Sequence, residues 1–230
     1  MNTQRNHNRI ALILLLGGLL LMAGCGGKVT PVHCYIGLDA SQSARPHLGG
    51  YTLLSGQLSG RLNAGVDALT LYRLDDHVTE FSDQPASGSL ATTLTAIARN
   101  VQQVSPGRGT FPAKYWEEVA ARAEQAPADV VILLFTDGDN DDQRAASTKS
   151  IRVAAERLAQ NPRVKQVILC GVEQRNYAWL HACFASLGEK RFHLLNPVEM
   201  DISTLADYVE QARKPATGAA ETGSVTEAHR

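Results

Sequence analysis

Several signatures of common enzyme classes are missing from this sequence of 230 residues. There is no GxSxG nucleophile elbow, no HExxH zinc motif and no phosphate-binding P-loop. None of the four cysteines forms a CxxC pair, so zinc-ribbon and thioredoxin-like sites have no support. The 22 Lys and Arg are balanced by 23 Asp and Glu and form no sustained basic run, so nothing indicates a nucleic-acid-binding surface.

The composition that remains is that of an ordinary folded domain. Hydrophobic residues make up 44% and charged residues 20%, which is enough apolar material for a full core, and the length leaves room for one α/β domain. Cys34 and Cys170 lie inside apolar runs and are interpreted as small buried hydrophobes. One disulfide among Cys34, Cys170 and Cys183 stays open as an alternative.

The amino terminus predicts export. Met1 to Arg9 is basic, Ile10 to Met22 is continuously apolar, and Ala23-Gly24 precedes Cys25, a pattern typical of a secretory signal peptide. Met22 to Cys25 also resembles the lipobox of bacterial lipoproteins, which implies a signal peptide over residues 1–24, acylation of Cys25 and a lipidated tether over residues 25–31. By the same resemblance, Gly26 implies the outer membrane where the organism has two membranes. An uncleaved membrane anchor is the alternative, and both interpretations place the domain outside the cytoplasm.

From residue 32 onward, strand-like and helix-like segments alternate. Asp75-Asp76-His77 is too short for a parallel crossover, so the two strands that it joins must form an antiparallel hairpin. The rest of the alternation predicts an α/β fold: a doubly wound, mostly parallel sheet with one antiparallel edge strand and helices on both faces. The domain is expected over residues 32–214, followed by a disordered tail over residues 215–230. The expected strands are Val32 to Leu38, Leu69 to Leu74, Val78 to Phe81, Val130 to Phe135, Val167 to Val172 and Phe192 to Leu195; the expected helices run to about Leu62 and over Ser89 to Val104, Ala113 to Glu124, Ala145 to Ala159, Tyr177 to Leu187 and Ile202 to Ala212.

Three oxygen-bearing side chains follow the first strand at alternate positions. Asp39, Ser41 and Ser43 would point the same way in an extended segment. Taken alone, the motif is also explained by capping of the next helix.

Asp137 follows the strand Val130 to Phe135, and ligands of parallel sheets bind beyond the carboxyl ends of the strands. If this strand lies beside the first, two carboxylates meet and need a counter-charge or a raised pKa. A hard divalent cation supplies that charge, and oxygen ligands suit Mg²⁺, Mn²⁺ or Ca²⁺.

Thr110, in the loop Gly107-Arg-Gly-Thr, is the third part of this candidate cation site. DxSxS, Gly-x-Thr and Thr-Asp-Gly in this order resemble the metal-ion-dependent adhesion site of von Willebrand A domains and integrin inserted domains, over roughly Pro31 to Lys214. The resemblance implies a site made of Asp39, Ser41, Ser43, Thr110 and Asp137, with one coordination position left for an acidic residue of a protein partner. Gln42 departs from the glycine that is frequent in the family. The expected rim of the partner-binding surface is Gln42, Arg45, Arg108, Phe111, Lys114 and Asp139.

Other candidate residues have plainer interpretations. An EF-hand that starts at Asp137 fails, because Asp142 and Thr148 stand where Gly and Glu are required. Asp139, Asp141 and Asp142 are therefore interpreted as solvated loop carboxylates, with a second cation site as the alternative. His47 and His77 are interpreted as surface residues, and Tyr115, Trp116 and Trp179 as packing residues.

These observations predict a membrane-anchored extracytoplasmic lipoprotein that binds a divalent cation and, through it, an envelope protein. The alternatives are a structural lipoprotein with a vestigial metal site and a Mg²⁺-dependent hydrolase acting on phosphate; we expect no catalysis, because no general base accompanies the site. The short tether, about 20 Å at most, would hold the start of the first strand near the bilayer, with the metal site at the opposite edge.

Overall fold

The computed structural model describes residues 29–102, 109–141 and 145–214. The predicted signal peptide, Cys25, Arg108, Asp142 and the predicted tail lie outside these residues. Within the described part of the chain, no helix has both the length and the apolar character needed to cross a membrane.

A six-stranded sheet forms the centre of the molecule, in the order β3-β2-β1-β4-β5-β6. Every neighbouring pair is parallel except β2 and β3, which form the antiparallel hairpin expected from the short Asp75–His77 joint. The predicted α/β class and the predicted topology are confirmed. The strands are β1 (Val32–Asp39), β2 (Ala68–Leu74), β3 (Val78–Pro85), β4 (Asp129–Phe135), β5 (Val164–Cys170) and β6 (Phe192–Leu195).

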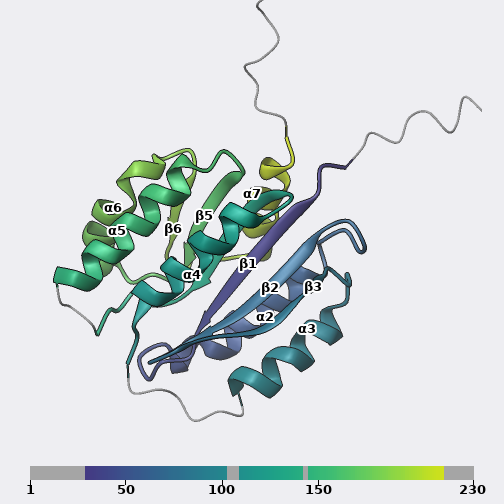
Figure 1. Cartoon of the computed structure of the whole chain (residues 1–230). Helices are drawn as coiled ribbons and strands as arrows, with labels where there is room; N and C mark the ends of the chain where they lie inside the picture. The colour runs from purple at the N-terminus through teal and green to yellow at the C-terminus, as the bar shows by residue number, and fades with distance from the viewer. Residues whose placement is uncertain (1–28, 103–108, 142–144, 215–230) are drawn as a thin grey trace, which may run out of the picture.

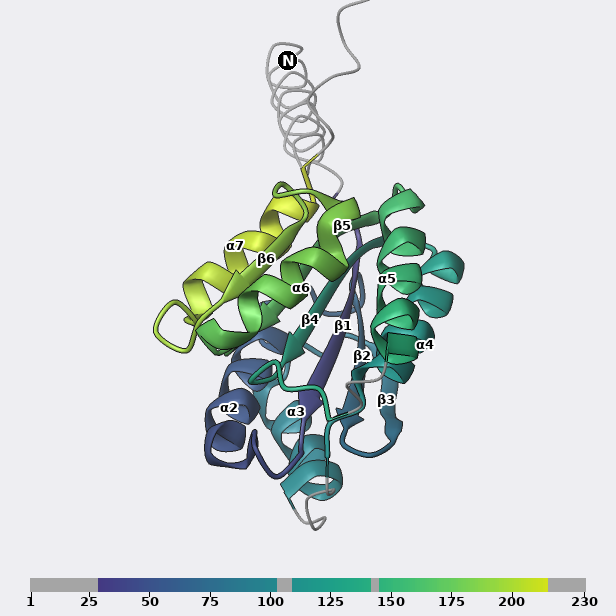
Figure 2. The same ribbon diagram turned by 90° about the vertical axis from the view of Figure 1, so that its left-hand side faces the viewer.

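Helices cover both faces of this sheet (Figure 2). One core cluster joins the sheet to α4 (Pro112–Gln125), α5 (Ala145–Gln160) and α6 (Tyr177–Phe184). The other joins it to α2 (Leu48–Ser59), α3 (Leu90–Ile97) and α7 (Ile202–Ala212). Because both faces are buried, the middle of the central strands is almost wholly apolar, as in Val130 to Phe135 of β4. Single turns of 3₁₀ helix lie at Arg45–His47, Gln174–Asn176 and Ala185–Leu187, and a π turn spans Ala98–Gln102.

The boundaries differ from expectation where the polar pattern is ambiguous. β3 continues to Pro85, four residues beyond the predicted end, because this edge strand is only partly buried and accepts polar side chains. β5 begins at Val164, since Lys165 and Gln166 belong to the strand. The helix predicted over Ser89 to Val104 is regular only to Ile97.

β1 is the central element and pairs with β2 and β4 along nearly its whole length. Cys34 of β1 and Cys170 of β5 are fully buried and free, as is Cys183 on α6. The interpretation of Cys34 and Cys170 as small buried hydrophobes is confirmed, and the described cysteines form no disulfide.

The beginnings and the ends of the central strands lie at two opposite edges of the sheet (Figure 1). β1, β2 and β4 all end at one edge, while β1 begins and α7 ends at the opposite edge. There, Arg213 donates to both carboxylate oxygens of Asp67, with nitrogen–oxygen distances of 2.9 and 2.6 Å, and to the carbonyl of Thr30 at 3.0 Å. The ion pair joins the end of α7 to the residue before β2, and the bond to Thr30 joins it to the chain that enters β1.

Candidate metal site

Asp39 ends β1 and its carboxylate is fully buried. Oδ1 accepts a hydrogen bond from the Ser41 backbone N–H at 2.9 Å, and Oδ2 accepts one from the Thr136 hydroxyl at 2.7 Å. The hydroxyl oxygens of Ser41 and Ser43 lie 3.2 Å apart. The chain turns after Ser41 instead of remaining extended, so the turn brings these two hydroxyls together. Neither the following 3₁₀ turn nor α2 has a side-chain cap at its N-cap residue, which argues against helix capping as the role of the motif.

Asp137 follows β4, which pairs with β1, and so lies at the same edge. The backbone N–H of Asp139 donates to Oδ1 of Asp137 at 3.0 Å. Between them, Gly138 has a φ of +86°, a left-handed conformation that glycine adopts without steric cost. The hydroxyl of Thr136 donates to Asp39 and accepts from the Gly138 N–H at 3.0 Å, so one side chain holds the two acidic loops together.

The Thr110 loop joins the same edge through Asp141. The Thr110 N–H donates to Oδ2 of Asp141 at 2.7 Å, and the Asp141 N–H donates to the Thr110 carbonyl at 3.0 Å. Gly109 permits this approach, because a Cβ there would lie 2.9 Å from Oδ2 of Asp141. The interpretation of Asp141 as merely a solvated carboxylate is therefore wrong: its residue is exposed, yet its carboxylate positions the threonine loop.

The hydroxyl of Thr110 is the most informative polar atom of the site. Thr110 is 1% exposed, and its Oγ1 has no hydrogen-bond partner within the described part of the chain. Buried hydroxyls are normally satisfied, since desolvation without a partner costs roughly 1–3 kcal/mol. An oxygen atom in this state at an edge with two carboxylates fits a metal ligand.

The electrostatics of the edge point the same way. Burial raises the pKa of Asp39 to about 6, against the lowering effect of hydrogen bonds from Ser41 and Thr136, and the Asp137 charge raises it further. Among the described residues no Lys or Arg forms an ion pair with Asp39 or Asp137. Carboxylate and hydroxyl oxygens suit a hard divalent cation, and the residues present fit one.

The described residues of the expected rim differ in their exposure and in their hydrogen bonds. Gln42, Arg45 and Lys114 are exposed, and Phe111 is half-buried. Asp139 is not a free solvated carboxylate, because it accepts hydrogen bonds from Arg175 and from Asn176. Asn176, which also donates to the Asp137 carbonyl at 3.0 Å, was not recognised from the sequence, since nothing local marks it.

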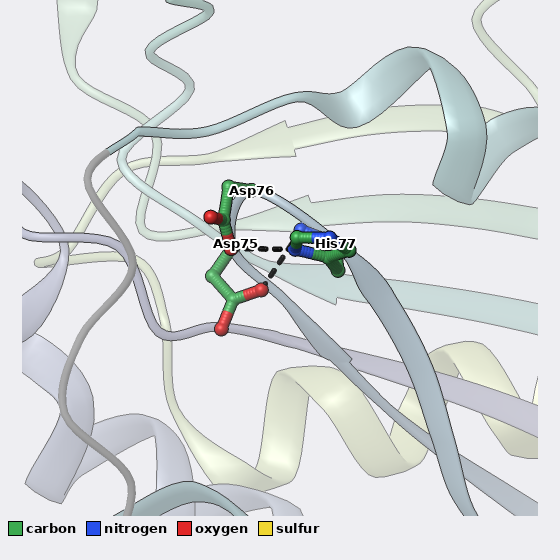
Figure 3. A group of neighbouring side chains, drawn as sticks. All are labelled: Asp75, Asp76 and His77. Carbon is green, nitrogen blue, oxygen red and sulfur yellow. Dashed lines mark hydrogen bonds and ion pairs between the residues drawn. The ribbon is translucent and has the colours of Figure 1, made fainter.

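A second group of candidate ligands, Asp75, Asp76 and His77, lies in the β2–β3 hairpin (Figure 3). One atom of each falls within 4.8 Å of the others. Asp75 is buried and neighbours the site, since its carbonyl accepts from the Phe111 N–H at 3.3 Å. Its two carboxylate oxygens already contact the His77 N–H at 2.9 Å and Arg73 Nε at 3.0 Å. His77 is exposed, as expected, but the sequence interpretation missed its place beside two carboxylates.

Neither a family model nor a curated relative matches this sequence. Solved structures do: a von Willebrand factor type A protein from Catenulispora acidiphila aligns with a TM-score of 0.58 over 81% of this chain and 42% of that one, at 16% identity. This chain has the von Willebrand factor A fold.

Two other solved structures extend the comparison. The PilB minor pilin from Streptococcus sanguinis aligns with a TM-score of 0.61 over 84% of this chain and 64% of that one, at 13% identity. Proximal thread matrix protein 1 from the mussel byssus, in a structure with a zinc-occupied MIDAS motif, aligns with a TM-score of 0.57 over 80% and 46%, at 19% identity. This chain thus spans less than two thirds of each of these proteins, and its likeness to them is one of fold.

Proposed function

We propose that this protein binds a divalent cation at Asp39, Ser41, Ser43, Thr110 and Asp137 and uses it to bind an acidic side chain of a protein partner. When bound, the cation supplies positive charge that a partner carboxylate ligates. The observation that carries the proposal is the buried, unpartnered Thr110 hydroxyl at an edge with two buried carboxylates. The mussel protein, whose structure has zinc in this motif, supports a divalent ion, and we favour Mg²⁺, with Mn²⁺ and Ca²⁺ as alternatives.

The chain's own residues hold the remaining parts of the site in place. Thr136 fixes the distance between the two acidic loops, and Asp141 fixes the threonine loop against them. Three loops from distant parts of the sequence are therefore organised by hydrogen bonds that do not involve the proposed Thr110 Oγ1 ligand. Such preorganisation lowers the entropic cost of binding an ion.

The binding test is a pull-down from envelope extracts in Mg²⁺ and in chelator. Thr110→Ala should lose metal-dependent capture, because it removes one proposed ligand but keeps the backbone bonds to Asp141. Thr95→Ala, an exposed threonine on α3, is the matched control and should capture as wild type does. Capture should also fall when a glutamate-containing peptide competes. Capture that survives chelator and Thr110→Ala would favour a structural lipoprotein, whereas metal-dependent phosphate release would favour a hydrolase.

The second part of the proposal is location. We propose an extracytoplasmic lipoprotein anchored through Cys25, and the likeness of the fold to a streptococcal pilin is compatible with a place at the cell surface. Cys25→Ala should abolish incorporation of labelled fatty acid and lipoprotein-type processing, while Cys183→Ala should not. Incorporation of label into Cys25→Ala would refute the acylation site. Since β1 starts at the edge opposite Asp39, such an anchor would leave the metal site facing away from the lipid.

A further inference from the structure

A pocket of about 420 Å³ opens beside the metal site. The loop after β4 forms one wall with Asp139 and Asp141, and the segment that begins α6 forms the other with Arg175, Asn176 and Trp179. No part of the proposed metal chemistry uses this pocket, and it was not predicted from the sequence.

The pocket shares its first wall with the metal site. The Asp139 N–H donates to the Asp137 carboxylate, and the Asp141 carboxylate accepts from the Thr110 N–H. Asn176 spans both sites, because its amide donates to the Asp137 carbonyl at 3.0 Å and to Asp139 Oδ1 at 2.9 Å. The pocket and the proposed metal site are therefore neighbours that share the loop after β4.

The pocket already binds one guanidinium group, that of Arg175. Its Nη2 lies 3.1 and 3.0 Å from the two oxygens of Asp139, and its Nε lies 2.8 Å from Glu173. The Arg175 side chain is 62% exposed, and ion pairs this exposed are weak. The pair shows that Asp139 is oriented to receive a guanidinium, and a pair of this kind can give way to a competing guanidinium.

The remaining lining favours a cation. Trp179 borders the pocket with its indole N–H fixed by Asn176 Oδ1 at 3.3 Å, and aromatic rings attract guanidinium and ammonium groups. Among the residues that the structure describes, the charged side chains around the pocket are Asp139, Asp141 and Glu173, with Arg175 as the cation. This excess of negative charge disfavours an acidic guest.

We propose that this pocket binds a basic side chain, arginine or lysine, of the same partner whose carboxylate ligates the cation. The inference rests on the proposed function of the metal site for the identity of the partner, but the pocket's own affinity for a basic group does not depend on metal. The recognised segment then carries an acidic and a basic residue close together.

The two tryptophans of the chain provide a direct readout. Trp179 lines the pocket, whereas Trp116 is buried in the core, so their indole N–H signals in a nitrogen–proton NMR spectrum of the full-length protein report the pocket and the core separately. Titration with N-acetyl-argininamide should shift the Trp179 signal and leave that of Trp116 unchanged, in Mg²⁺ and in chelator alike. N-acetyl-citrullinamide, a neutral molecule of the same shape, should not shift it. An equal response to the neutral probe, or none to the basic one, would overturn the proposal.

Two variants sharpen this test. Asp139→Asn should abolish the shift, because it removes the charge but keeps the backbone bond to Asp137. Arg175→Gln should increase the affinity for the probe, by up to about fivefold, because it removes the competing guanidinium. Weaker binding of the basic probe by Arg175→Gln would contradict the proposed exchange.

A series of peptides then tests whether one ligand can occupy the metal site and the pocket together. Peptides with one glutamate and one arginine separated by zero to three glycines should include a spacing that binds at least about tenfold more tightly in Mg²⁺ than peptides with either residue replaced by glutamine. If the arginine probe binds but no peptide responds to Mg²⁺, the metal proposal fails and the pocket stands. If glutamate peptides respond to Mg²⁺ and the arginine adds nothing at any spacing, the metal proposal stands and the pocket proposal fails.

Discussion

Asp39 and Asp67 are both buried aspartates at opposite edges of one sheet, yet their pKa values move in opposite directions. Burial raises the pKa of both. At Asp67, hydrogen bonds from Arg213 and from the backbone N–H groups of Val32 and Asn63 outweigh burial and lower it. At Asp39, hydroxyl and amide donors do not outweigh burial, and its pKa rises to about 6.

The difference is whether the chain itself supplies the counter-charge. The edge with Asp67 is completed by an arginine from the end of α7 and needs no ligand. The edge with Asp39 has donors that orient the carboxylate but no paired cation among the described residues, which is the arrangement expected for binding an external cation. We therefore expect the Asp67 edge to contribute to stability and the Asp39 edge to bind a ligand.

The largest effect should come from removing the ion pair between Arg213 and Asp67. Arg213→Met would leave the Asp67 carboxylate buried without a charge partner, which costs about 3–5 kcal/mol. Urea denaturation of wild type and variant measures this loss. The control is Arg157→Met, which removes an exposed pair with Glu124 and should cost about 1 kcal/mol or less. Similar losses for the two variants would show that the Asp67 pair is no more important than a surface pair.

A smaller effect is expected from binding a divalent cation at the edge with Asp39. Mg²⁺ or Mn²⁺ at 100 times its dissociation constant should stabilise the protein by about 2.7 kcal/mol. This corresponds to a rise in Tm of about 5–10 °C for a domain of this size. Thermal scans of Asp39→Ala should show a folded protein without that rise. Equal responses of wild type and variant would place the bound metal elsewhere, with the Asp75–His77 hairpin as the first candidate.

The smallest effect should be a pH dependence of opposite sign at the two edges, measured by urea denaturation in chelator. A carboxyl with a raised pKa contributes stability that is present below its unfolded pKa of about 3.9 and lost as the pH rises. For Asp39 that loss extends to about pH 6, and Asp39→Asn should reduce it. Asp67, with a lowered pKa, contributes above pH 4 and loses this contribution in acid. Asp67→Asn should therefore be most destabilising near neutral pH, and identical pH profiles for the two variants would refute the contrast.

Much of the fold was predictable because its signals are local. The apolar runs of β1 and β4, the short joint at Asp75–His77 and the first-turn proline of α4 each specify their element without distant information. β3 was predicted too short, because an edge strand that is open on one side carries a polar pattern resembling a loop. The π turn after Ile97 has no local signature that the pattern of apolar residues reveals.

The candidate site also has a part that was predictable from the sequence and a part that was not. The predicted ligand residues of β1 and β4 follow adjacent strands, so topology alone brings them to one edge. The residues that position them were not predictable: Thr136, Asp141 and Asn176 act through hydrogen bonds to partners 31 to 97 positions away in the sequence. The pocket near Trp179 was missed for this reason, because its two walls come together only in the folded chain.

The central position of β1 has a mechanical consequence. The strand runs from the edge next to the amino-terminal segment to the edge with Asp39, and it is hydrogen-bonded on both sides to parallel neighbours. A pull between the chain before Val32 and a partner held at Asp39 acts along the strand axis. Its backbone hydrogen bonds are perpendicular or slanted to that axis and are therefore loaded in shear together, not opened one after another. Tension applied in this direction is therefore resisted by many backbone hydrogen bonds at once.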